Sequence, residues 1–234
     1  MKFIKIITFT FLVITVKVVN AQKSASIMRT IYVAGLVFDY NNLKPISGID
    51  IYNKSNEFLV KTDERGYFKT QLHVKKTGEI YFSLIIKGEK FKTIIQSEHW
   101  GDIQGNLKAI YYFGLTDKNN KDKPFSELSH KIRDTSYEII IEGFKEVKEK
   151  INLNNKIQEN LKGNENVFIV VDGNYYIVNE TGRIKLKSKE DLISINNNEY
   201  IPAHKVNSIL KRNEIKNMSN SNSKNASVII YTKK

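Results

Sequence analysis

The sequence contains no cysteine and only three prolines among its 234 residues. Without thiols it can form no disulfide bond, no thiolate nucleophile and no cysteine-ligated metal site. It also has no cysteine after its N-terminal segment that could accept a lipid, so we do not expect a lipoprotein. We therefore expect the packing of apolar side chains to stabilise the fold.

Long apolar runs are missing beyond the N-terminus. Residues 1–21 have a basic start, an apolar run over 6–16 and a small residue at Ala21, which is typical of a signal peptide cleaved before Gln22. A transmembrane anchor is the alternative, but Lys17 ends the run well short of the roughly 20 residues a spanning helix needs. We expect an exported protein, periplasmic or associated with the outer membrane, with no transmembrane segment in the mature chain.

The net charge of +12 raises the question of an anionic partner. The signal segment holds three lysines and no acidic residue, so its removal lowers the charge to +9. Basic and acidic residues are interspersed along the rest of the chain, whereas nucleic-acid binding requires a clustered basic face in a recognisable module. We therefore expect no nucleic-acid partner.

Residues 30–116 show short β-type segments separated by turn residues, with no helical period. The sequence DERG at 63–66 predicts a tight turn, because an Asp side chain can bond the backbone ahead and Gly accepts a positive φ. This pattern predicts an antiparallel β-sandwich. The expected strands are 31–38, 49–53, 58–62, 67–72, 79–87, 91–96 and 107–115.

A polar stretch follows, and we expect residues 117–133 to be a linker. Beyond it, apolar residues recur at spacings of three and four from Tyr137 to Ile151, which predicts an amphipathic helix that ends near Asn154-Asn155. Residues 167–186 read as a β-meander turned by Asp172-Gly173. Further expectations are a short helix at 203–211, a mobile loop at 217–225, and a closing strand at 228–231 paired beside 167–171. Together these indicate a smaller α/β domain over 134–234 and an α+β chain.

The first domain resembles the carboxypeptidase-regulatory-like, or transthyretin-like, β-sandwich common in exported proteins of Bacteroidetes-type bacteria. The matching sequences are GLVFD at 35–39, PISGIDIY at 45–52 and TDERGYF at 62–68, in the family's order. The resemblance implies a transthyretin/Ig-like module, mainly non-catalytic, attached to other domains.

The second domain is similar to the plug of TonB-dependent outer-membrane receptors in two places. FIVVDG at 168–173 resembles the plug's V-D-G strand, and NASVIIYTKK at 225–234 resembles its closing strand. Ser227 stands where the family usually has Gly, and no barrel of alternating strands follows, so transport by this chain is not expected. The alternative is that VVDG is simply a strand and its hairpin turn.

No motif for catalysis, a cofactor or a metal is found, and we assign no catalytic, cofactor-binding or metal-binding residue. The four histidines are scattered. Glu98-His99-Trp100-Gly101-Asp102 is the one suggestive cluster, but neighbours on a strand point to opposite faces, and we expect Trp100 to pack on the sandwich. Tyr111-Tyr112 and Tyr175-Tyr176 could bind glycan or peptide, with one ring of each pair facing solvent. Strand addition by a partner at an open sheet edge is a second route.

The sequence thus predicts a non-enzymatic, exported binding or scaffolding protein of the cell envelope with a protein partner there. The alternative is an accessory domain pair that recruits a separate envelope hydrolase or peptidase. An enzymatic role would require Glu98, His99 and Asp102 to meet a carboxylate or hydroxyl in a deep pocket.

Overall fold

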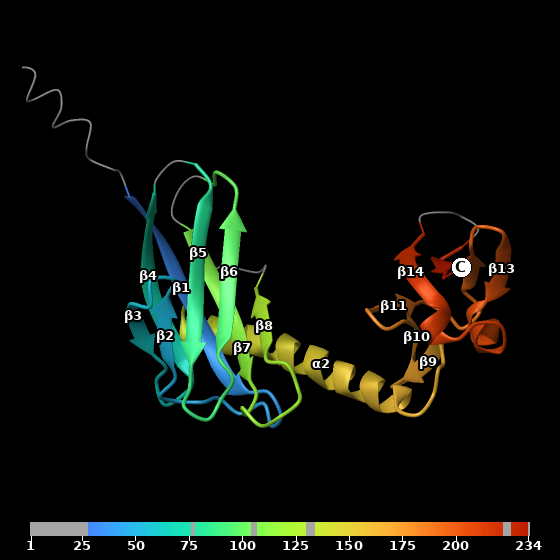
Figure 1. The fold of residues 1–234 in the computed structure, drawn as a ribbon, viewed down its shortest axis with the longest axis horizontal. Helices are drawn as coiled ribbons and strands as arrows, with labels where there is room; N and C mark the ends of the chain where they lie inside the picture. Colours follow the sequence, from blue (N-terminus) through green and yellow to red (C-terminus); the bar gives the residue numbers. More distant parts are fainter. Residues whose placement is uncertain (1–27, 76–77, 104–106, 130–133, 222–225, 234) are drawn as a thin grey trace, which may run out of the picture. The chain divides into compact units, whose positions relative to one another are not determined.

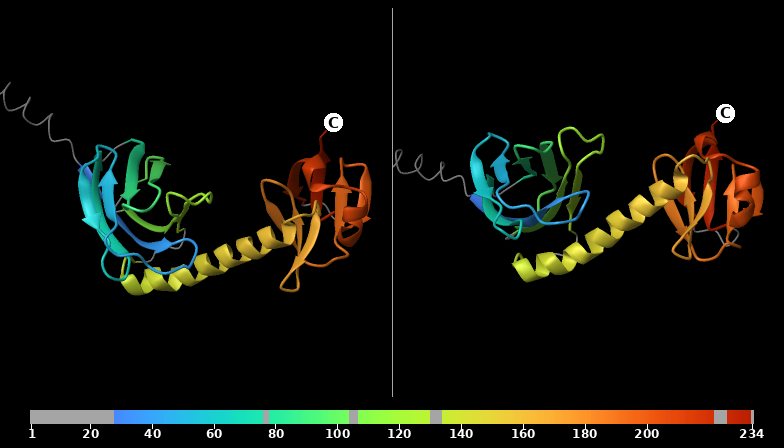
Figure 2. Two further views of the ribbon diagram at one scale, coloured as in Figure 1. Left: turned by 60° about the horizontal axis from the view of Figure 1, so that its bottom comes forward. Right: turned by 90° about the horizontal axis from the view of Figure 1, so that it is seen from below.

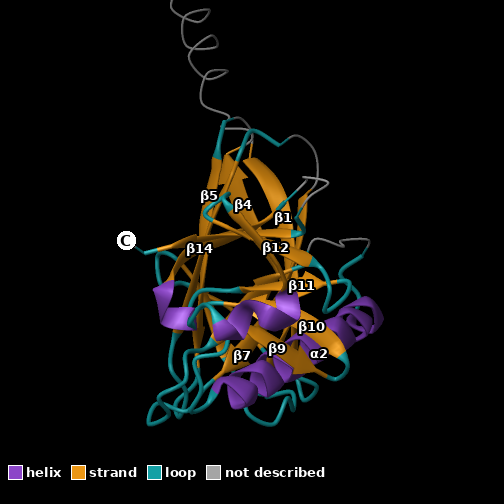
Figure 3. Ribbon diagram, turned by 90° about the vertical axis from the view of Figure 1, so that its right-hand side faces the viewer, coloured by secondary structure: helices purple, strands orange, loops and turns teal. Residues whose placement is uncertain are grey.

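The computed structural model describes residues 28–75, 78–103, 107–129, 134–221 and 226–233. The expected signal segment, residues 1–21, lies outside this part of the chain. Strands dominate the described residues (Figure 3). Most of their pairings are antiparallel. The chain divides into one unit that ends at Val147 and a second that starts at Lys148.

The first unit is an antiparallel β-sandwich, as the strand pattern predicts (Figure 1). One sheet has the order β4-β1-β7-β8 and the other β3-β2-β5-β6. Only β1 and β7 run parallel among the paired strands of this unit. The strands are β1 (Met28–Asp39), β2 (Asp50–Asn53), β3 (Phe58–Lys61), β4 (Tyr67–Lys75), β5 (Ile80–Lys87), β6 (Ile94–Trp100), β7 (Leu107–Leu115) and β8 (Phe125–Leu128).

An apolar core fills the space between the two sheets. Ile31, Val33 and Phe113 from one sheet and Leu84 and Ile86 from the other are fully buried there. Alternate residues of each strand supply this core, because side chains change faces at every residue. The hydrophobic effect of burying these side chains is the main driving force for the fold of this unit.

The turn at 63–66 forms as predicted and brings β4 back toward β1. Oδ1 of Asp63 accepts backbone hydrogen bonds from Arg65 and Tyr67, both at 2.9 Å. Gly66 has φ +71°, and a Cβ on it would lie 2.5 Å from the carbonyl oxygen of Val37. The turn therefore requires glycine for its conformation and for the close approach of β1.

The segment expected to be a linker contains β8, which pairs with β7 from Tyr111 to Gly114 as an edge strand. The sandwich therefore extends past residue 116. Residues 130–133 lie outside the described chain. Sequence patterning misses β8 because FSEL is short and has only two apolar residues.

Helix α2 (Tyr137–Leu161) begins where the apolar period predicts but continues past Asn154-Asn155. Ile157 and Leu161 extend its apolar stripe and are buried with Ile169 and Tyr176. This burial outweighs the low helix propensity of the two asparagines, which is only a weak preference. The start of α2, within the first unit, lies against the β4-β1-β7-β8 sheet (Figure 2).

The second unit has two sheets of orders β11-β10-β9 and β13-β12-β15-β14. An apolar core that includes Ile177, Ile193 and Ile230 joins them. The expected meander is present as β9, β10 and β11, and the expected short helix is present as a 3-10 helix. The elements are β9 (Phe168–Val171), β10 (Asn174–Val178), β11 (Arg183–Leu186), β12 (Leu192–Ile195), β13 (Glu199–Pro202), η1 (Ala203–Ser208), η2 (Arg212–Glu214), β14 (Ile215–Asn220) and β15 (Val228–Thr232).

Two expectations for the end of the chain are wrong. The closing strand β15 does not pair beside 167–171; it lies between β12 and β14, in the other sheet. The side chain of Asn207 instead closes the start of β9, because its Oδ1 accepts hydrogen bonds from the amides of Val167 and Phe168 at 2.7 and 2.8 Å.

The expected mobile loop at 217–225 is also mostly strand as far as it is described. Residues 217–220 belong to β14, whose Met218 pairs with Ile230, and residues 222–225 lie outside the described chain. The low-complexity sequence predicts a loop, but β14 is a polar edge strand, and its neighbour β15 supplies the apolar side chains. Within the described residues, no helix combines the length and apolarity that a membrane crossing requires.

Candidate binding surface

The one suggestive cluster, residues 98–102, does not form a site, because its side chains lie in three different places. Glu98 and Trp100 point into the sandwich, while His99 lies on its outer surface. Asp102 lies beyond the end of β6, where its carboxylate is 3.7 Å from the guanidinium of Arg29. The alternation of a strand separates these neighbours, as the sequence predicts.

The inward part of the cluster is structural. Glu98 accepts hydrogen bonds from Trp100 Nε1 at 2.9 Å and from Gln96 Nε2 at 2.7 Å. Burial, and then the nearby Glu98 carboxylate, raise the pKa of the Tyr111 hydroxyl. The ring of Trp100 packs against the core and lies nearly perpendicular to the ring of Phe82, so its expected packing role is confirmed. Glu98 is thus engaged by its neighbours in the wall of the sandwich.

The remaining histidines are held apart by the fold. His73 contacts Thr30, and His204 lies near Lys189 and Glu190, whereas His130 is outside the described residues. Among the residues that the structure describes, no group of three His, Cys, Asp or Glu side chains is placed to hold a metal ion.

The expectation that one ring of each tyrosine pair faces solvent is wrong for Tyr111-Tyr112, both of which are buried, whereas in the second pair Tyr176 is buried and Tyr175 is half-buried. Tyr111 is buried in the sandwich core, and Tyr112 is buried on the opposite face of β7, beneath α2. Tyr176 is buried against the second half of α2, and Tyr175 packs on the ring of Phe168. Both faces of β7 are thus covered at this pair, one by the facing sheet and the other by the helix.

The outer face of the β3-β2-β5-β6 sheet is the one sandwich surface where exposed apolar side chains gather among the described residues. We call it the open face, and define it by Phe58, Tyr52, Ile85, Ile95, Tyr81 and His99. The strand registers place Phe58, Tyr52, Ile85 and Ile95 in one row across all four strands. Phe58 is 56% exposed and Ile95 is 68% exposed.

Aromatic and charged side chains lie at the end of the open face where β5 begins. The rings of Tyr81 and His99 stack with centroids 4.4 Å apart and planes 8° apart. The Tyr81 hydroxyl donates to Oε2 of Glu79, and Nε2 of His99 lies 3.1 Å from the same oxygen. The hydrogen bond from Tyr81, followed by the hydrogen bond and then the electrostatic attraction of His99, lowers the pKa of Glu79. The two rings thus lie parallel to each other, and both contact the Glu79 carboxylate.

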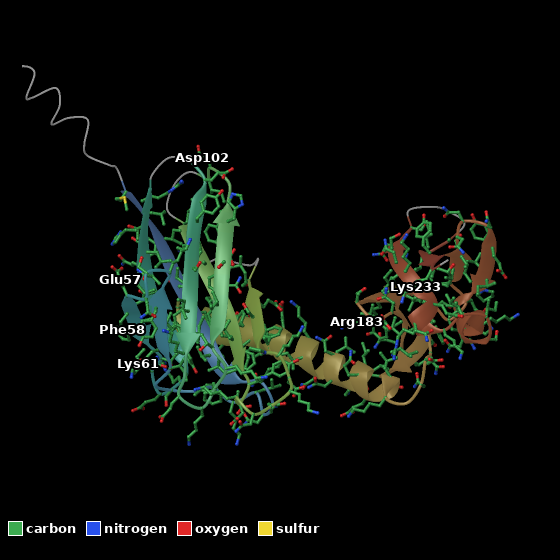
Figure 4. The ribbon with its side chains drawn as sticks, viewed as in Figure 1. Glu57, Phe58, Lys61, Asp102, Arg183 and Lys233 are labelled. Atoms are coloured by element: carbon green, nitrogen blue, oxygen red, sulfur yellow. The ribbon has the colours of Figure 1, made fainter. Side chains whose placement is uncertain are left out.

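Lysines lie at the opposite end of the open face, where β3 and β5 end. Lys87 Nζ lies 4.7 Å from the centroid of the Tyr52 ring and donates to Asn56 Oδ1 at 2.6 Å. Lys61 Nζ pairs with Oδ1 of Asp50 at 3.0 Å. Figure 4 shows Phe58 and Lys61 together at the β3 side of the sandwich, away from Asp102. An apolar face with lysines at one end of its strands and a carboxylate at the other can orient a partner.

The hollows seen among the described residues of the second unit are shallow and polar. The largest of those described has a volume of about 500 Å³ and is lined in part by Ile209, Glu214 and Lys233. A second, of about 370 Å³, lies beside Tyr175 and Lys187. Small-molecule sites are generally enclosed and mainly apolar, which these hollows are not.

Sequence reasoning missed the open face although the signal was present. In EIYFSLIIK at 79–87, the residues Ile80, Phe82, Leu84 and Ile86 alternate toward the core. Tyr81 and Ile85 are therefore out of phase with the core and share the other face. Apolar residues on both faces of a strand predict a second covering layer, but they do not say whether the chain itself supplies it.

The sequence matches no protein-family profile and no curated protein. Two solved structures are similar in part. One is 3-chlorocatechol 1,2-dioxygenase from Rhodococcus opacus 1CP, with TM-score 0.31, 15% identity, and 40% of this chain and 62% of that one covered. The other is catechol 1,2-dioxygenase from Acinetobacter sp. ADP1, with TM-score 0.25, 12% identity, and coverages of 45% and 52%.

The chain thus spans about half to three fifths of the length of these two structures. Both are enzymes, and this finding contradicts the expectation that the chain is not an enzyme, which we withdraw. The low TM-scores assign neither an activity nor a substrate to this chain.

Proposed function

We propose that this chain is an exported cell-envelope protein that binds or scaffolds a protein partner, and that the open face of its sandwich is the contact surface. The observation behind this is the row from Phe58 to Ile95, which crosses four strands with its two ends more than half exposed. Contiguous apolar surface of this kind is uncommon on isolated soluble domains and is typical of interaction sites.

The two sheets of the sandwich differ in a way that supports this proposal. The β4-β1-β7-β8 sheet has its outer face covered by the start of α2, through Tyr112 and Phe144. No described segment of the first unit is packed on the outer side of the β3-β2-β5-β6 sheet in the same way. A partner is then the source of its covering layer.

The sequence supplies the location and lineage in this proposal. The N-terminal pattern supports export, and the motifs at 35–39, 45–52 and 62–68 support a carboxypeptidase-regulatory-like sandwich. The 168–173 and 225–234 segments support a relation of the second unit to receptor plugs. In such an arrangement the sandwich presents the binding surface and the second unit supplies a further attachment domain.

The test places a photo-reactive amino acid at Phe58 in the full chain, expressed in a Gram-negative host with the signal segment intact. Irradiation should cross-link this position to an envelope protein, and fractionation should recover the chain from the envelope. The matched control carries the same group at Gln71, an exposed residue of β4 on the other sheet, and should give no such product. Recovery in the cytoplasm, or equal products at both positions, would overturn the proposal.

A further inference from the structure

Strand β6 lies at the edge of the β3-β2-β5-β6 sheet and has a strand neighbour on one side only. It pairs with β5 without interruption from Ile94 opposite Ile86 to Trp100 opposite Ile80. Outside that ladder, residues 94–100 make no backbone hydrogen bond to any other described segment. On its free side, the amides and carbonyls of alternate residues have no backbone partner among the described residues, and they can pair with another strand.

The other long or regular edges have features that discourage such pairing, and β6 lacks them. The β2–β3 pairing has a register shift between Ile51 and Tyr52, and β14 has one between Ile215 and Asn217. Strand β13 ends in Pro202, and β4 includes Lys69. The sequence of β6, IIQSEHW, has no lysine, no proline and no bulge. Lysine, proline and bulges are common protections of a sheet edge. An inward-pointing charge is another, but the one in β6, the carboxylate of Glu98, already accepts hydrogen bonds from Gln96 and Trp100 of its own chain.

We propose that two copies of this chain associate through β6, in antiparallel register centred on Ser97. The two β3-β2-β5-β6 sheets would then form one eight-stranded sheet with both open faces on the same side. This register pairs all seven residues of the strand. The inference goes beyond the proposed function and does not depend on it, because the partner here is a second copy.

The inward-facing residues of β6 are complementary in this register. Gln96 of one copy lies opposite Glu98 of the other, so an amide donor faces a carboxylate acceptor across the junction. Ile94 lies opposite Trp100, an aliphatic and aromatic pair that is favourable between neighbouring strands. Glu98 is the one inward charge of the strand, and its two oxygens already accept from Gln96 and Trp100.

The outward-facing residues fit equally well. Ser97 meets its own copy at the two-fold axis, where two small hydroxyls permit close approach. Ile95 lies opposite His99 of the other copy, whose ring is stacked on Tyr81. An isoleucine that is 68% exposed on the isolated chain would thus be covered by two flat rings. The pairing accounts for the most exposed of the large apolar side chains in the described residues.

Two neighbouring registers would also place the open faces of both copies on the same side. Both are less favourable, because of the charges they bring together and because fewer residues pair. Centring on residue 98 places Glu98 directly opposite Glu98 of the other copy, which like-charge repulsion opposes. Centring on Gln96 places Glu98 opposite Ile94 and leaves the carboxylate against an apolar side chain. Each of these registers pairs only five of the seven residues.

The absence of cysteine makes a direct test possible. In Ser97→Cys the only thiols of the preparation meet across the axis, at a separation a disulfide can span. Mild oxidation with oxidised glutathione at micromolar protein should give a disulfide-linked dimer roughly tenfold faster than Gln71→Cys, which carries its thiol on the exposed β4 edge. Equal rates for the two variants would overturn the register.

A second measurement does not use thiols. Sedimentation velocity of the mature chain should show a monomer–dimer equilibrium in the micromolar range. Ser97→Lys should give only monomer, because it opposes two ammonium groups at the axis, whereas Gln71→Lys should leave the equilibrium unchanged. Far-ultraviolet circular dichroism confirms that both variants are folded. A mature chain that stays monomeric at 100 μM or so, well above the usual range for a weak specific interface, would overturn the proposal.

The two proposals fail separately. A monomeric chain that still cross-links through residue 58 to an envelope protein would retain the proposed function and lose the dimer. A dimer abolished by Ser97→Lys but with no cross-link at residue 58 would do the reverse. A foreign peptide on β6, with no self-association, would also contradict the dimer.

Discussion

The hydroxyl of Tyr112 donates a 3.0 Å hydrogen bond to the backbone carbonyl of Ile140, joining β7 to the first turns of α2. The ring of Phe144 lies nearly parallel to that of Tyr112, with planes 13° apart and centroids 6.1 Å apart. Burial, followed by the charges of Glu127 and Glu146, raises the pKa of Tyr112 to about 12. This contact packs the start of α2 on the β4-β1-β7-β8 sheet, whereas no described segment of the first unit covers the open face in the same way.

We expect Gly143→Ala to destabilise the first unit by about 1–2 kcal/mol. A Cβ at this position would lie 2.2 Å from the Tyr112 hydroxyl, so either the ring or the helix must move. Overpacking of this kind costs about 1–3 kcal/mol, and the better helix propensity of Ala returns up to about 1 kcal/mol. Chemical denaturation followed by tryptophan fluorescence measures the effect, because Trp100 is the single tryptophan and lies in this unit.

Gly101→Ala is the matched control for that experiment. No atom lies within 4 Å of a Cβ built at Gly101, so its replacement should change the free energy of unfolding by less than about 0.5 kcal/mol. A midpoint for Gly143→Ala equal to that of Gly101→Ala would show that α2 is not packed on Tyr112 as described.

The raised pKa of Tyr112 predicts a loss of stability in alkali. The unfolded chain ionises this tyrosine near its ordinary pKa of about 10, whereas the folded chain holds it neutral up to about 12. The contribution is therefore complete below pH 10 and is lost between about pH 10 and pH 12. Tyr112→Phe cannot ionise, so its stability deficit relative to the unmodified chain should shrink across that window.

Fluorescence-monitored denaturation at several pH values from 8 to 12 measures this difference. Lysine titration affects both proteins and cancels in the comparison. Ile110→Val, which removes a buried methyl group from the same strand and no ionisable group, serves as control, and its stability deficit should not change with pH. A Tyr112→Phe deficit that is constant with pH would contradict the burial of this hydroxyl.

Two glycines with the same backbone conformation should differ in their tolerance of alanine. Gly66 and Gly48 have φ of +71° and +73°, but only Gly66 has close neighbours, with the Val37 carbonyl 2.5 Å from a built Cβ. Gly48→Ala should cost about 1–2 kcal/mol from backbone strain alone. Gly66→Ala should cost clearly more, because β1 and β4 must also separate. Thermal melting of the first unit measures the loss of stability in each variant. Equal losses would show that backbone strain alone determines the cost.

Strand alternation and turn chemistry made the sandwich predictable from the sequence. The DERG turn follows from Asp63 and Gly66, and the core-facing residues of β5 follow from their period of two. The position of β15 in its sheet could not be predicted from the sequence, because an apolar run such as VIIY can pair with any strand that has a free side. The closure of β9 by the side chain of Asn207, 36 residues beyond Val171, has no local signal that could have revealed it.

The open face shows the corresponding limit for function. Periodicity places Tyr81 and Ile85 on a second apolar face of β5, but it places Tyr112 on a second apolar face of β7 in the same way. Which face the helix covers depends on Gly143 and Phe144 meeting Tyr112, a contact between residues about 30 positions apart. Tertiary packing therefore decides which aromatic residues remain for a partner.

Deletion of residues 227–234 should unfold the second unit and leave the sandwich intact. Strand β15 is central in its sheet, with β12 on one side and β14 on the other. Val228 and Ile230 are fully buried, and the loss of each removes about 1.5–3 kcal/mol of hydrophobic stabilisation together with two ladders of hydrogen bonds. A marginally stable unit of this size does not survive such a loss.

Proton–nitrogen correlation spectra of the full and shortened chains separate the two units. Amide signals of residues 148–221 should collapse to unfolded positions in the shortened chain, while the fluorescence-detected melting of the first unit should be unchanged. Deletion of Lys233 and Lys234 alone is the control; it removes one described backbone hydrogen bond, from Lys233 to the Glu214 carbonyl, and should preserve the spectrum. Dispersed second-unit signals after the longer deletion would show that β12 and β14 hold together without β15, contrary to the sheet order described.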